Sequence, residues 1–203
     1  MEKKSKQLRL KQLYNEYEKE FAGEELVFGD GNVETGIIMI GEAPGKDEVK
    51  LGRPFVGLAG GKLKNFIEYL GLKREDIYVT NAIKYRLYKV NSYSGKKSNR
   101  PAKSHEIKAS AGYLREEIEI LCPKLVITLG NVPLKAVISE LKPVIGDFHG
   151  KIITYGGFNF FPLYHPASLI YNRSLEEAYY KDLDKLKEVI GGLIDDSFYN
   201  HRN

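Results

Sequence analysis

Four polar residues of this chain stand where short apolar segments end. Glu42 and Glu48 follow the first such segment. Asn81 lies near the end of the second, and His165 closes the last. A carboxylate can accept protons, an amide can donate and accept hydrogen bonds at once, and a histidine can do either near neutral pH. Together these groups suit the recognition of a planar polar ligand and acid–base chemistry beside it.

Phe55 is the candidate for the apolar side of such a site. The segment GRPFVGLAGG (52–61) places its ring between glycines and other small residues. A flat ring in a glycine-lined slot can stack on a planar ligand such as a nucleic-acid base. The alternative is that Phe55 is a core residue beneath a loop, and the segment alone does not separate the two.

The spacing of residues in the sequence excludes several other kinds of functional site. GEAPGKDE (41–48) has three residues between its glycines and Asp47 after the lysine, so it is not a phosphate-binding P-loop. The dinucleotide fingerprint GxGxxG and the nucleophile elbow GxSxG are both missing from the chain. Cys122 is the single cysteine, and no cluster of His, Cys or acids has metal-ligand spacing. We therefore expect neither a disulfide nor a metal site.

A repeated pattern of strands and helices must position these residues. Uninterrupted apolar runs, typical of strands buried on both faces of a parallel sheet, cover 36–41, 76–83, 124–130 and 158–165. Helical stretches lie between them at 60–71, 104–120 and 131–141. Residues 151–155 are expected to add an edge or hairpin strand.

This alternation predicts one α/β domain over residues 1–203, with an amphipathic helix within residues 1–25 packed on its body. We expect a three-layer α/β/α sandwich around a central four-stranded parallel sheet joined by right-handed crossovers. Ligands of such sheets bind beyond the carboxyl ends of the strands, which is where Glu42, Asn81 and His165 are placed. One rim of the sheet should therefore carry the site.

Positive charge is concentrated in one segment. The formal net charge is only +4, yet residues 84–108 hold eight Lys or Arg residues and one acid, with three tyrosines between them. Such a segment is typical of a phosphate-facing surface, although a solvated basic loop without a ligand fits the composition equally well. Within it, residues 88–103 are predicted to be the most mobile loop of the chain.

The N-terminal region and the composition indicate a soluble protein. The first 21 residues are charged throughout, and no apolar stretch approaches the length of a membrane span. A single cysteine fits a reducing compartment. We therefore expect a cytoplasmic protein with neither a leader nor a membrane partner.

Six short motifs occur in an order and spacing that resemble one enzyme family. They are GEAPG, GRPFVGLAGGKL, TNAIK, NR with a downstream HEI, PKLVITLG and YHPASLIYN. Each motif is weak alone, but together they resemble the family 4 uracil-DNA glycosylases across roughly residues 27–190. The resemblance implies a base excision repair enzyme that removes uracil from single- or double-stranded DNA and leaves an abasic site.

The resemblance also implies roles for the residues of the pocket. Phe55 matches the ring on which the flipped uracil stacks, and Asn81 matches the amide that reads O4 and N3 of the base. His165 matches the histidine that faces O2, where charge builds as the glycosidic bond breaks. The backbone amides of Glu42 and Ala43 are expected to line the same pocket.

Activation of the attacking water has two candidates. Other branches of the superfamily carry an acid or an amide one residue beyond the position of Glu42, and this chain has Ala43 there. Glu42 and Glu48 remain as candidate catalytic carboxylates. Glu48 can equally serve as a partner that fixes the loop.

Contacts to the rest of the DNA are expected on two segments. One follows His165, where the resemblance implies a loop that enters the minor groove and fills the space left by the flipped base. The other is the basic segment. The predicted DNA-binding residues are Lys84, Arg86, Lys96, Lys97, Arg100, Asn131, Ser168, Leu169, Ile170 and Arg173.

The chain departs from the family at an iron–sulfur cluster. The resemblance implies four cysteine ligands, yet Tyr85 and Ser110 stand at two of those places and the N-terminal pair is missing. A cluster needs thiolates, so no cofactor is expected. Packing by tyrosines of this region must then replace it, and the candidates are Tyr14, Tyr17, Tyr85 and Tyr88.

Two alternatives to a monomeric uracil-DNA glycosylase stay open. One is a catalytically weak or silent protein of the same fold that binds DNA or a damaged base, which the missing cluster and Ala43 allow. The other is a glycosylase for another deaminated base such as hypoxanthine, which Asn81 disfavours. Only an enzyme converts a uracil-containing strand into an alkali-labile abasic site.

Overall fold

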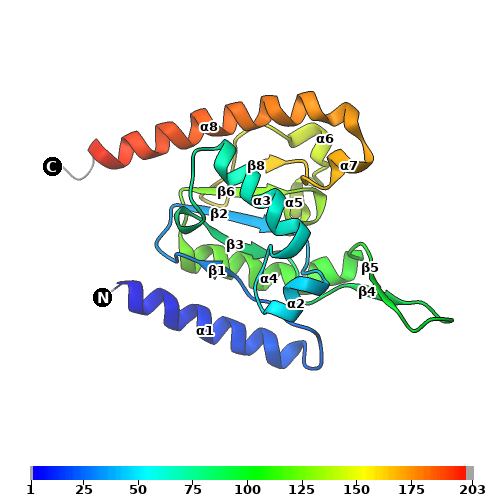
Figure 1. Ribbon diagram of the computed structural model, residues 1–203. Helices are drawn as coiled ribbons and strands as arrows, with labels where there is room; N and C mark the ends of the chain where they lie inside the picture. Colours follow the sequence, from blue (N-terminus) through cyan, green and yellow to red (C-terminus); the bar gives the residue numbers. More distant parts are fainter. Residues whose placement is uncertain (1, 200–203) are drawn as a thin grey trace.

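The structure of the protein, a computed structural model, describes residues 2–199 (Figure 1). Side chains in this range are described except at residues 2–4, 58, 59, 62, 170, 171 and 194–199. A six-stranded sheet forms the middle layer, in the order β1-β3-β2-β6-β8-β7. Its strands are β1 (Asp30–Gly31), β2 (Ile37–Gly41), β3 (Tyr78–Asn81), β6 (Leu125–Leu129), β7 (Ile153–Tyr155) and β8 (Phe158–Leu163).

The four inner strands of this sheet run parallel, and the two edge strands run antiparallel to them. Strand β2 is buried along its whole length, as an apolar run covered on both faces should be. The prediction of an α/β fold around a parallel sheet is confirmed. The short strands β1 and β7 widen the sheet at its edges, and the second of them lies where residues 151–155 predicted one.

Helices cover both faces of the sheet. They are α1 (Glu2–Glu20), α2 (Lys46–Leu51), α3 (Gly57–Tyr69), α4 (Ser104–Leu121), α5 (Asn131–Val137), α6 (Ile145–Phe148), α7 (Ser168–Tyr171) and α8 (Glu176–Tyr199), with 3-10 turns η1 (Arg74–Asp76), η2 (Ser139–Leu141) and η3 (Arg173–Leu175). Within residues 2–199, none of them is both long and apolar enough to cross a lipid bilayer.

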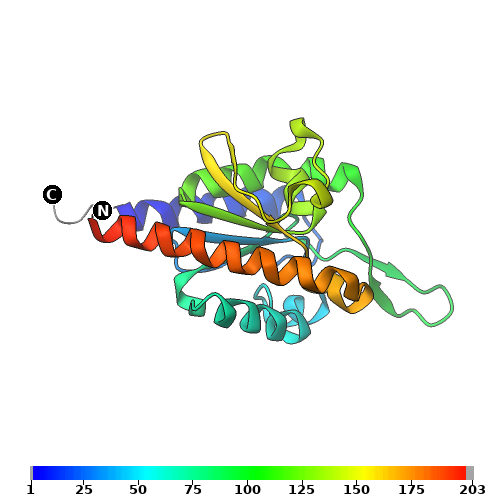
Figure 2. The same ribbon diagram turned by 90° about the horizontal axis from the view of Figure 1, so that it is seen from above.

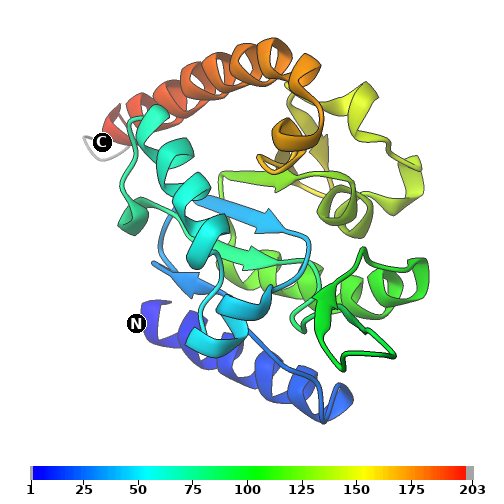
Figure 3. The same cartoon turned by 45° about the vertical axis from the view of Figure 1, so that its right-hand side comes forward.

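The three layers follow from the alternation of side chains along each strand. Ile38 and Ile40 of β2 pack in a cluster with residues of α1, α4 and α5. Ile37 and Met39 point to the other face, where they pack with residues of α3 and α8. Figures 2 and 3 show this arrangement from above and from the side, with α1 and α4 on one face and α3 on the other.

Two elements differ from the sequence predictions. The segment predicted as a mobile loop contains a two-stranded antiparallel hairpin, formed by β4 (Tyr88–Val90) and β5 (Lys97–Asn99). Each strand has only three residues, and all of them except the half-buried Tyr88 are exposed, so the sequence carries no run long enough to mark a strand. The long helix α8 was not among the predicted helices, although it covers one face of the sheet.

An aromatic cluster joins α1 to the segments that follow β3. The ring of Tyr17 lies 4.3 Å from that of Phe21 and 4.9 Å from that of Tyr113. Phe21 in turn lies 5.1 Å from Tyr85, and the Tyr17 hydroxyl bonds to Ser110 Oγ at 2.8 Å. Aromatic packing and one hydrogen bond thus engage Tyr85 and Ser110, the two residues where the resemblance implies cysteine ligands.

Three of the four tyrosines predicted to hold this region do pack there. Tyr17 and Tyr85 are members of the cluster, and Tyr14 stacks on Phe28 with ring centres 4.4 Å apart. Tyr88 lies on the hairpin instead, where the ammonium of Lys97 sits 4.0 Å from its ring centre. That contact is of the cation–π kind.

Candidate active site

Gly41, Asn81 and Phe55 meet at the carboxyl end of the sheet. Gly41 ends β2 and stands opposite Asn81, which ends β3. A Cβ atom placed on Gly41 would lie 2.5 Å from Asn81 Oδ1 and 2.5 Å from Phe55 Cζ. The bare backbone of Gly41 therefore allows the amide and the ring to approach one another, a role that the sequence analysis missed.

The side-chain amide of Asn81 is buried, and its nitrogen lacks a hydrogen-bond partner among the described residues. The residue is 3% exposed, and the nitrogen concerned is Nδ2. A buried donor without a partner costs about 1–3 kcal/mol. Native proteins keep few such groups, and a functional site is one of the usual reasons. The Asn81 amide thus has the character of a group that a ligand completes.

Phe55 is held in a strained conformation by Glu48. Its φ angle is +53°, in the left-handed region that residues other than glycine rarely adopt. Glu48 Oε1 accepts the Phe55 N–H at 2.8 Å, and Glu48 Oε2 accepts the N–H of Gly45 in a short bond. Burial raises the pKa of Glu48, while these two backbone bonds lower it. Since both oxygens are engaged, the contacts of Glu48 match the loop-fixing role.

The carboxylate of Glu42 makes fewer hydrogen bonds than that of Glu48. It is half-buried, and its Oε1 accepts the N–H of Ala102 at 2.9 Å. No bond to its Oε2 is made by the described residues, so one carboxylate oxygen can still meet a water molecule. The neighbouring Ala43 packs against the aromatic cluster. Of the two carboxylates left open by the sequence, Glu42 is the one with acceptor capacity to spare.

His165 follows β8 and lies next to the end of β6. A Cβ on Gly130 would lie 3.5 Å from His165 Cβ. The backbone N–H of Ala167 donates to His165 Nδ1 at 3.1 Å, and the N–H of Ser168 donates to the His165 carbonyl at 2.8 Å. In a neutral imidazole whose Nδ1 is an acceptor, Nε2 carries the proton. The ring is therefore set to present an N–H donor.

Comparison with known proteins assigns the chain to a family. The profile of the Uracil DNA glycosylase superfamily matches residues 28–188, which is most of the chain. The chain belongs to the uracil-DNA glycosylase superfamily. The family resemblance predicted from six short motifs is thereby confirmed.

Individual members of the superfamily match over similar lengths. The chain is 36% identical over 170 residues to a type-4 uracil-DNA glycosylase of Saccharolobus solfataricus, covering 80% of this chain and 74% of that protein. It is 35% identical over 168 residues to the type-4 uracil-DNA glycosylase of Thermotoga maritima, covering 81% and 83%. It is also 30% identical over 165 residues to the DNA polymerase of Bacillus phage SP01, covering 81% of this chain and 17% of the polymerase.

An iron–sulfur cluster does not fit this member of the superfamily. The chain has one cysteine, Cys122, which is exposed and cannot supply four thiolates. Tyr85 and Ser110 are engaged in the packing and hydrogen bonding described above. Among the described residues, no group of three or more His, Cys, Asp or Glu is placed to hold a metal ion.

The prediction that Lys84 contacts DNA phosphates is wrong. Its side chain is 1% exposed, and its ammonium donates to Glu117 Oε2 at 2.5 Å and to Thr80 Oγ1 at 2.8 Å. A third bond, of 2.6 Å, reaches the backbone carbonyl of Asn81. Burial lowers the pKa of Lys84, and the pairing with Glu117 opposes this. Lys84 therefore supports the strand end that carries the Asn81 amide, from inside the protein.

The same correction applies to Arg86 of the basic segment, while Arg100 is ion-paired but partly exposed. Arg86 is 6% exposed and bonds to Asn99 Oδ1 at 3.1 Å and Glu25 Oε2 at 3.4 Å. Arg100 donates to both oxygens of Glu106, at 2.6 and 2.9 Å. This pairing lowers the pKa of Glu106 to about 2. The charge of Arg86 is thus used inside the protein and not offered to phosphate, whereas the Arg100 side chain is 23% exposed, and its contact with DNA stays a prediction.

The remaining basic residues predicted to bind DNA lie at the surface. Lys96 and Arg173 are exposed. Lys97 is 39% exposed but its ammonium lies 2.7 Å from Glu25 Oε1. Asn131 is exposed, and its Oδ1 accepts the N–H of Ile145 at 2.8 Å. These four positions are compatible with a DNA contact, which the structure by itself does not test.

The segment after His165 forms the short helix α7. Ser168 and Leu169 are half-buried, and Leu169 packs against the core cluster that contains residues of α3 and α8. The side chain of Ile170 lies outside the described part of the chain. Whether this segment enters a DNA groove stays a prediction.

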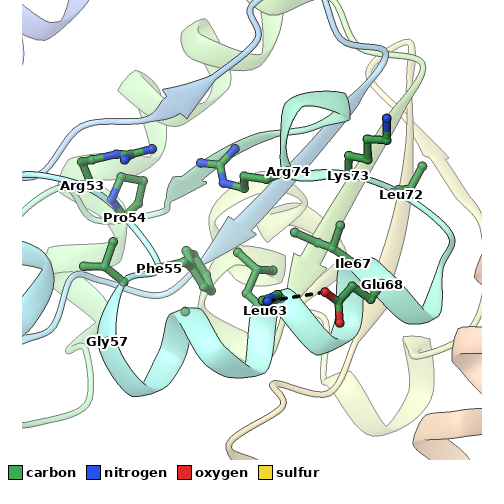
Figure 4. A pocket seen from close by; sticks show the side chains of 13 residues that line it. Arg53, Pro54, Phe55, Gly57, Leu63, Ile67, Glu68, Leu72, Lys73 and Arg74 are labelled. Carbon is green, nitrogen blue, oxygen red and sulfur yellow. Dashed lines mark ion pairs between the residues drawn. The ribbon is translucent and has the colours of Figure 1, made fainter.

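Phe55 also lines a cleft beside α3 and η1. Figure 4 shows this cleft of about 620 Å³, with Arg53 and Arg74 at its rim. Both guanidinium groups bond to Asp30 Oδ2, at 2.8 and 3.0 Å. The cleft shares Phe55 with the group around Gly41, but Asn81 and Gly41 are not among the residues that line it.

Proposed function

We propose that this chain excises uracil from DNA. It flips the uracil nucleotide out of the base stack, binds the base against Phe55 and Asn81, and hydrolyses the N-glycosidic bond to leave an abasic site. The observation that carries the proposal is the buried Asn81 amide, which lacks a partner and lies beside the Phe55 ring at Gly41. Similarity to proteins named uracil-DNA glycosylases supports the same activity.

The amide of Asn81 selects the base. Its Nδ2 donates to O4 of uracil, and its Oδ1 accepts from N3–H. Cytosine presents an amino donor and an unprotonated nitrogen at these two places, so both bonds are lost. Two unsatisfied buried groups amount to roughly 2–6 kcal/mol, which is enough for strong rejection of cytosine.

His165 stabilises the departing base. As the bond to C1′ breaks, negative charge builds on the pyrimidine, and a donor at O2 is worth more in the transition state than in the ground state. Nε2–H of His165 supplies that donor, because the Ala167 N–H occupies Nδ1. Removal of a comparable donor from an oxyanion site typically lowers kcat by about 100- to 1000-fold.

Glu42 orients the attacking water or takes its proton, and Glu48 holds the loop that carries Phe55. This division follows because Oε2 of the half-buried Glu42 accepts no bond from the described residues, whereas both oxygens of the buried Glu48 accept backbone bonds. Lys96, Arg173 and the helix α7 contact the DNA around the lesion. We also propose that the chain acts as a monomer in the cytoplasm.

The test is a cleavage assay on labelled oligonucleotides that contain one uracil, one hypoxanthine or no lesion. Purified protein should give alkali-labile breaks at uracil alone. The variants His165→Ala and Phe55→Ala should lose activity by about 100-fold or more, while Lys187→Met, at an exposed position of α8, should match the wild type. Binding without cleavage would identify a silent DNA-binding protein, and cleavage at hypoxanthine alone would identify a different substrate.

A further inference from the structure

The β4–β5 hairpin, residues 88–99, projects from the body at the end of the sheet that carries the candidate site (Figures 1 and 2). Its strands are in register from Tyr88 opposite Asn99 to Val90 opposite Lys97. Every residue from 89 to 99 is exposed. The hairpin is therefore a surface element, and packing against the body does not account for its composition.

The tip of the hairpin has a defined shape. Asn91 Oδ1 accepts the N–H groups of Tyr93 and Ser94 at 3.0 and 2.9 Å, and the Asn91 carbonyl accepts that of Gly95 at 2.9 Å. Gly95 takes a φ of +65°, which closes the turn. At this fixed tip Tyr93 is 100% exposed. A large aromatic ring held fully in water is unused by the fold and available to a ligand.

The base of the hairpin is fixed to the site. Arg86 Nε donates to Asn99 Oδ1 at 3.1 Å, and Arg100 Nε donates to the Tyr88 carbonyl at 3.2 Å. Just beyond the hairpin, the N–H of Ala102 donates to Glu42 Oε1 at 2.9 Å. The direction in which the hairpin points is thus coupled to the loop that carries a candidate catalytic carboxylate.

The charge of this segment points to a polyanion. Residues 88–103 contain five Lys or Arg residues and no Asp or Glu. Lys97 and Arg100 are paired with acids from elsewhere in the chain. Lys89 and Lys96 are exposed and make no ion pair with the described residues. One unpaired ammonium therefore stands on each side of the tip that presents Tyr93.

We propose that the β4–β5 hairpin is an arm that holds the DNA strand beside the uracil, with Lys89 and Lys96 on phosphates and Tyr93 stacked on an unpaired base. The proposal rests on uracil excision as the function of the site. From Tyr88 to Tyr93 an extended chain spans at most about 17 Å. That corresponds to about five nucleotides of one strand at 3.4 Å each. Because a duplex hides the faces of its bases, the arm favours single-stranded DNA next to the lesion.

The first experiment measures binding of the full chain to uracil-free single strands and to the matching duplex by fluorescence anisotropy at several salt concentrations. Tyr93→Ala should weaken single-strand binding by roughly 5- to 150-fold, the range expected for one stacked base, and leave duplex binding within about twofold. Tyr93→Phe, which keeps the ring, is the matched control and should bind like the wild type. Equal losses on both DNAs, or no loss, would overturn the stacking.

The contribution of Lys89 and Lys96 is measured by the salt dependence of DNA binding. For single strands, log K falls with log salt by about 0.7 for each phosphate contact. The double variant Lys89→Gln, Lys96→Gln should therefore lower the steepness of this dependence by about 1.4, whereas Tyr93→Ala should leave it unchanged. An unchanged slope in the lysine variant would remove the phosphate contacts from the proposal.

A second experiment separates the arm from the active site. Uracil is placed in a single strand with either one or eight nucleotides on each side. Tyr93→Ala should match the wild type on the short strand, which the arm cannot reach, and fall behind it on the long one. If the wild type excises nothing from either strand, uracil excision has failed, while the binding experiment still decides on the arm.

Discussion

The buried pair of Lys84 and Glu117 sets the size of one mutational effect. Lys84→Met keeps a side chain of similar length but removes the ammonium, so the carboxylate of Glu117, which is 0% exposed, loses its counter-charge. Breaking a buried ion pair in this way typically costs about 3–5 kcal/mol. That is a large part of a total stability of about 5–15 kcal/mol. The Asn81 carbonyl loses a donor in the same step.

Urea unfolding of the wild type and four variants tests this value. Lys84→Met and Glu117→Leu should each lower the free energy of unfolding by about 3–5 kcal/mol. The double variant removes both charges. Its loss of unfolding free energy should therefore be about 2 kcal/mol or more smaller than the sum of the two single losses. Lys187→Met, an exposed control on α8, should stay within about 0.5 kcal/mol of the wild type. A double variant whose loss equals the sum would refute the ion-pair argument.

Activity gives the second half of the test. Lys84 bonds to the backbone carbonyl of Asn81, so its loss should loosen the strand end that presents the amide. At a temperature where Lys84→Met is still folded, the ratio of uracil to cytosine excision should fall. If the protein is less stable but the ratio is unchanged, Lys84 acts on stability alone.

Three further outcomes follow from contacts in and around the site. Gly41→Ala should lower the single-turnover rate on uracil by about 100-fold or more, because its Cβ would meet both the amide and the ring of the site. Gly112→Ala, in the middle of α4 with nothing within 4 Å, should leave that rate unchanged and raise stability by about 0.5–1 kcal/mol. The pKa of Glu106 is lowered in the folded state from 4.5 to about 2, so its stabilising effect is present above pH 4.5 and is lost as the pH falls towards 2. Glu106→Gln should therefore flatten the fall in wild-type stability over that range, and parallel pH curves would contradict the assignment. Glu42→Gln should lower kcat with little change in Tm, and Glu48→Gln should lower Tm more strongly; the reverse pattern would exchange their roles.

The sheet could be predicted from the sequence because its inner strands are covered on both faces. Each then appears as an unbroken apolar run, as in residues 37–41. The hairpin gave no such signal, since it faces water on both sides. Helix α8 could have been predicted as well, because Tyr179, Leu183, Leu186 and Ile190 recur at helical spacing and are all buried.

The residues that form the pocket could be predicted from the sequence, but which of the basic residues face water could not. Asn81 and Phe55 stand in motifs whose position at strand ends implies a pocket, and the structure brings them together at Gly41. The error at Lys84 arose because a list of basic residues does not show which of them face water. Its partner Glu117 lies 33 positions away, on the buried face of α4 beside Leu114 and Leu121. An acid on such a face is the signal that reveals a buried counter-charge.

The aromatic cluster of Tyr17, Phe21 and Tyr85 also determines which conditions change the stability of this protein. Where a bound metal holds a domain together, its binding free energy becomes part of the folding free energy, and stability varies with metal supply. Here the N-terminal helix and the segment after β3 are joined by buried rings, whose contribution varies with temperature and cosolvents instead. Folding is thereby uncoupled from iron availability and from the oxidants that destroy exposed metal–sulfur centres.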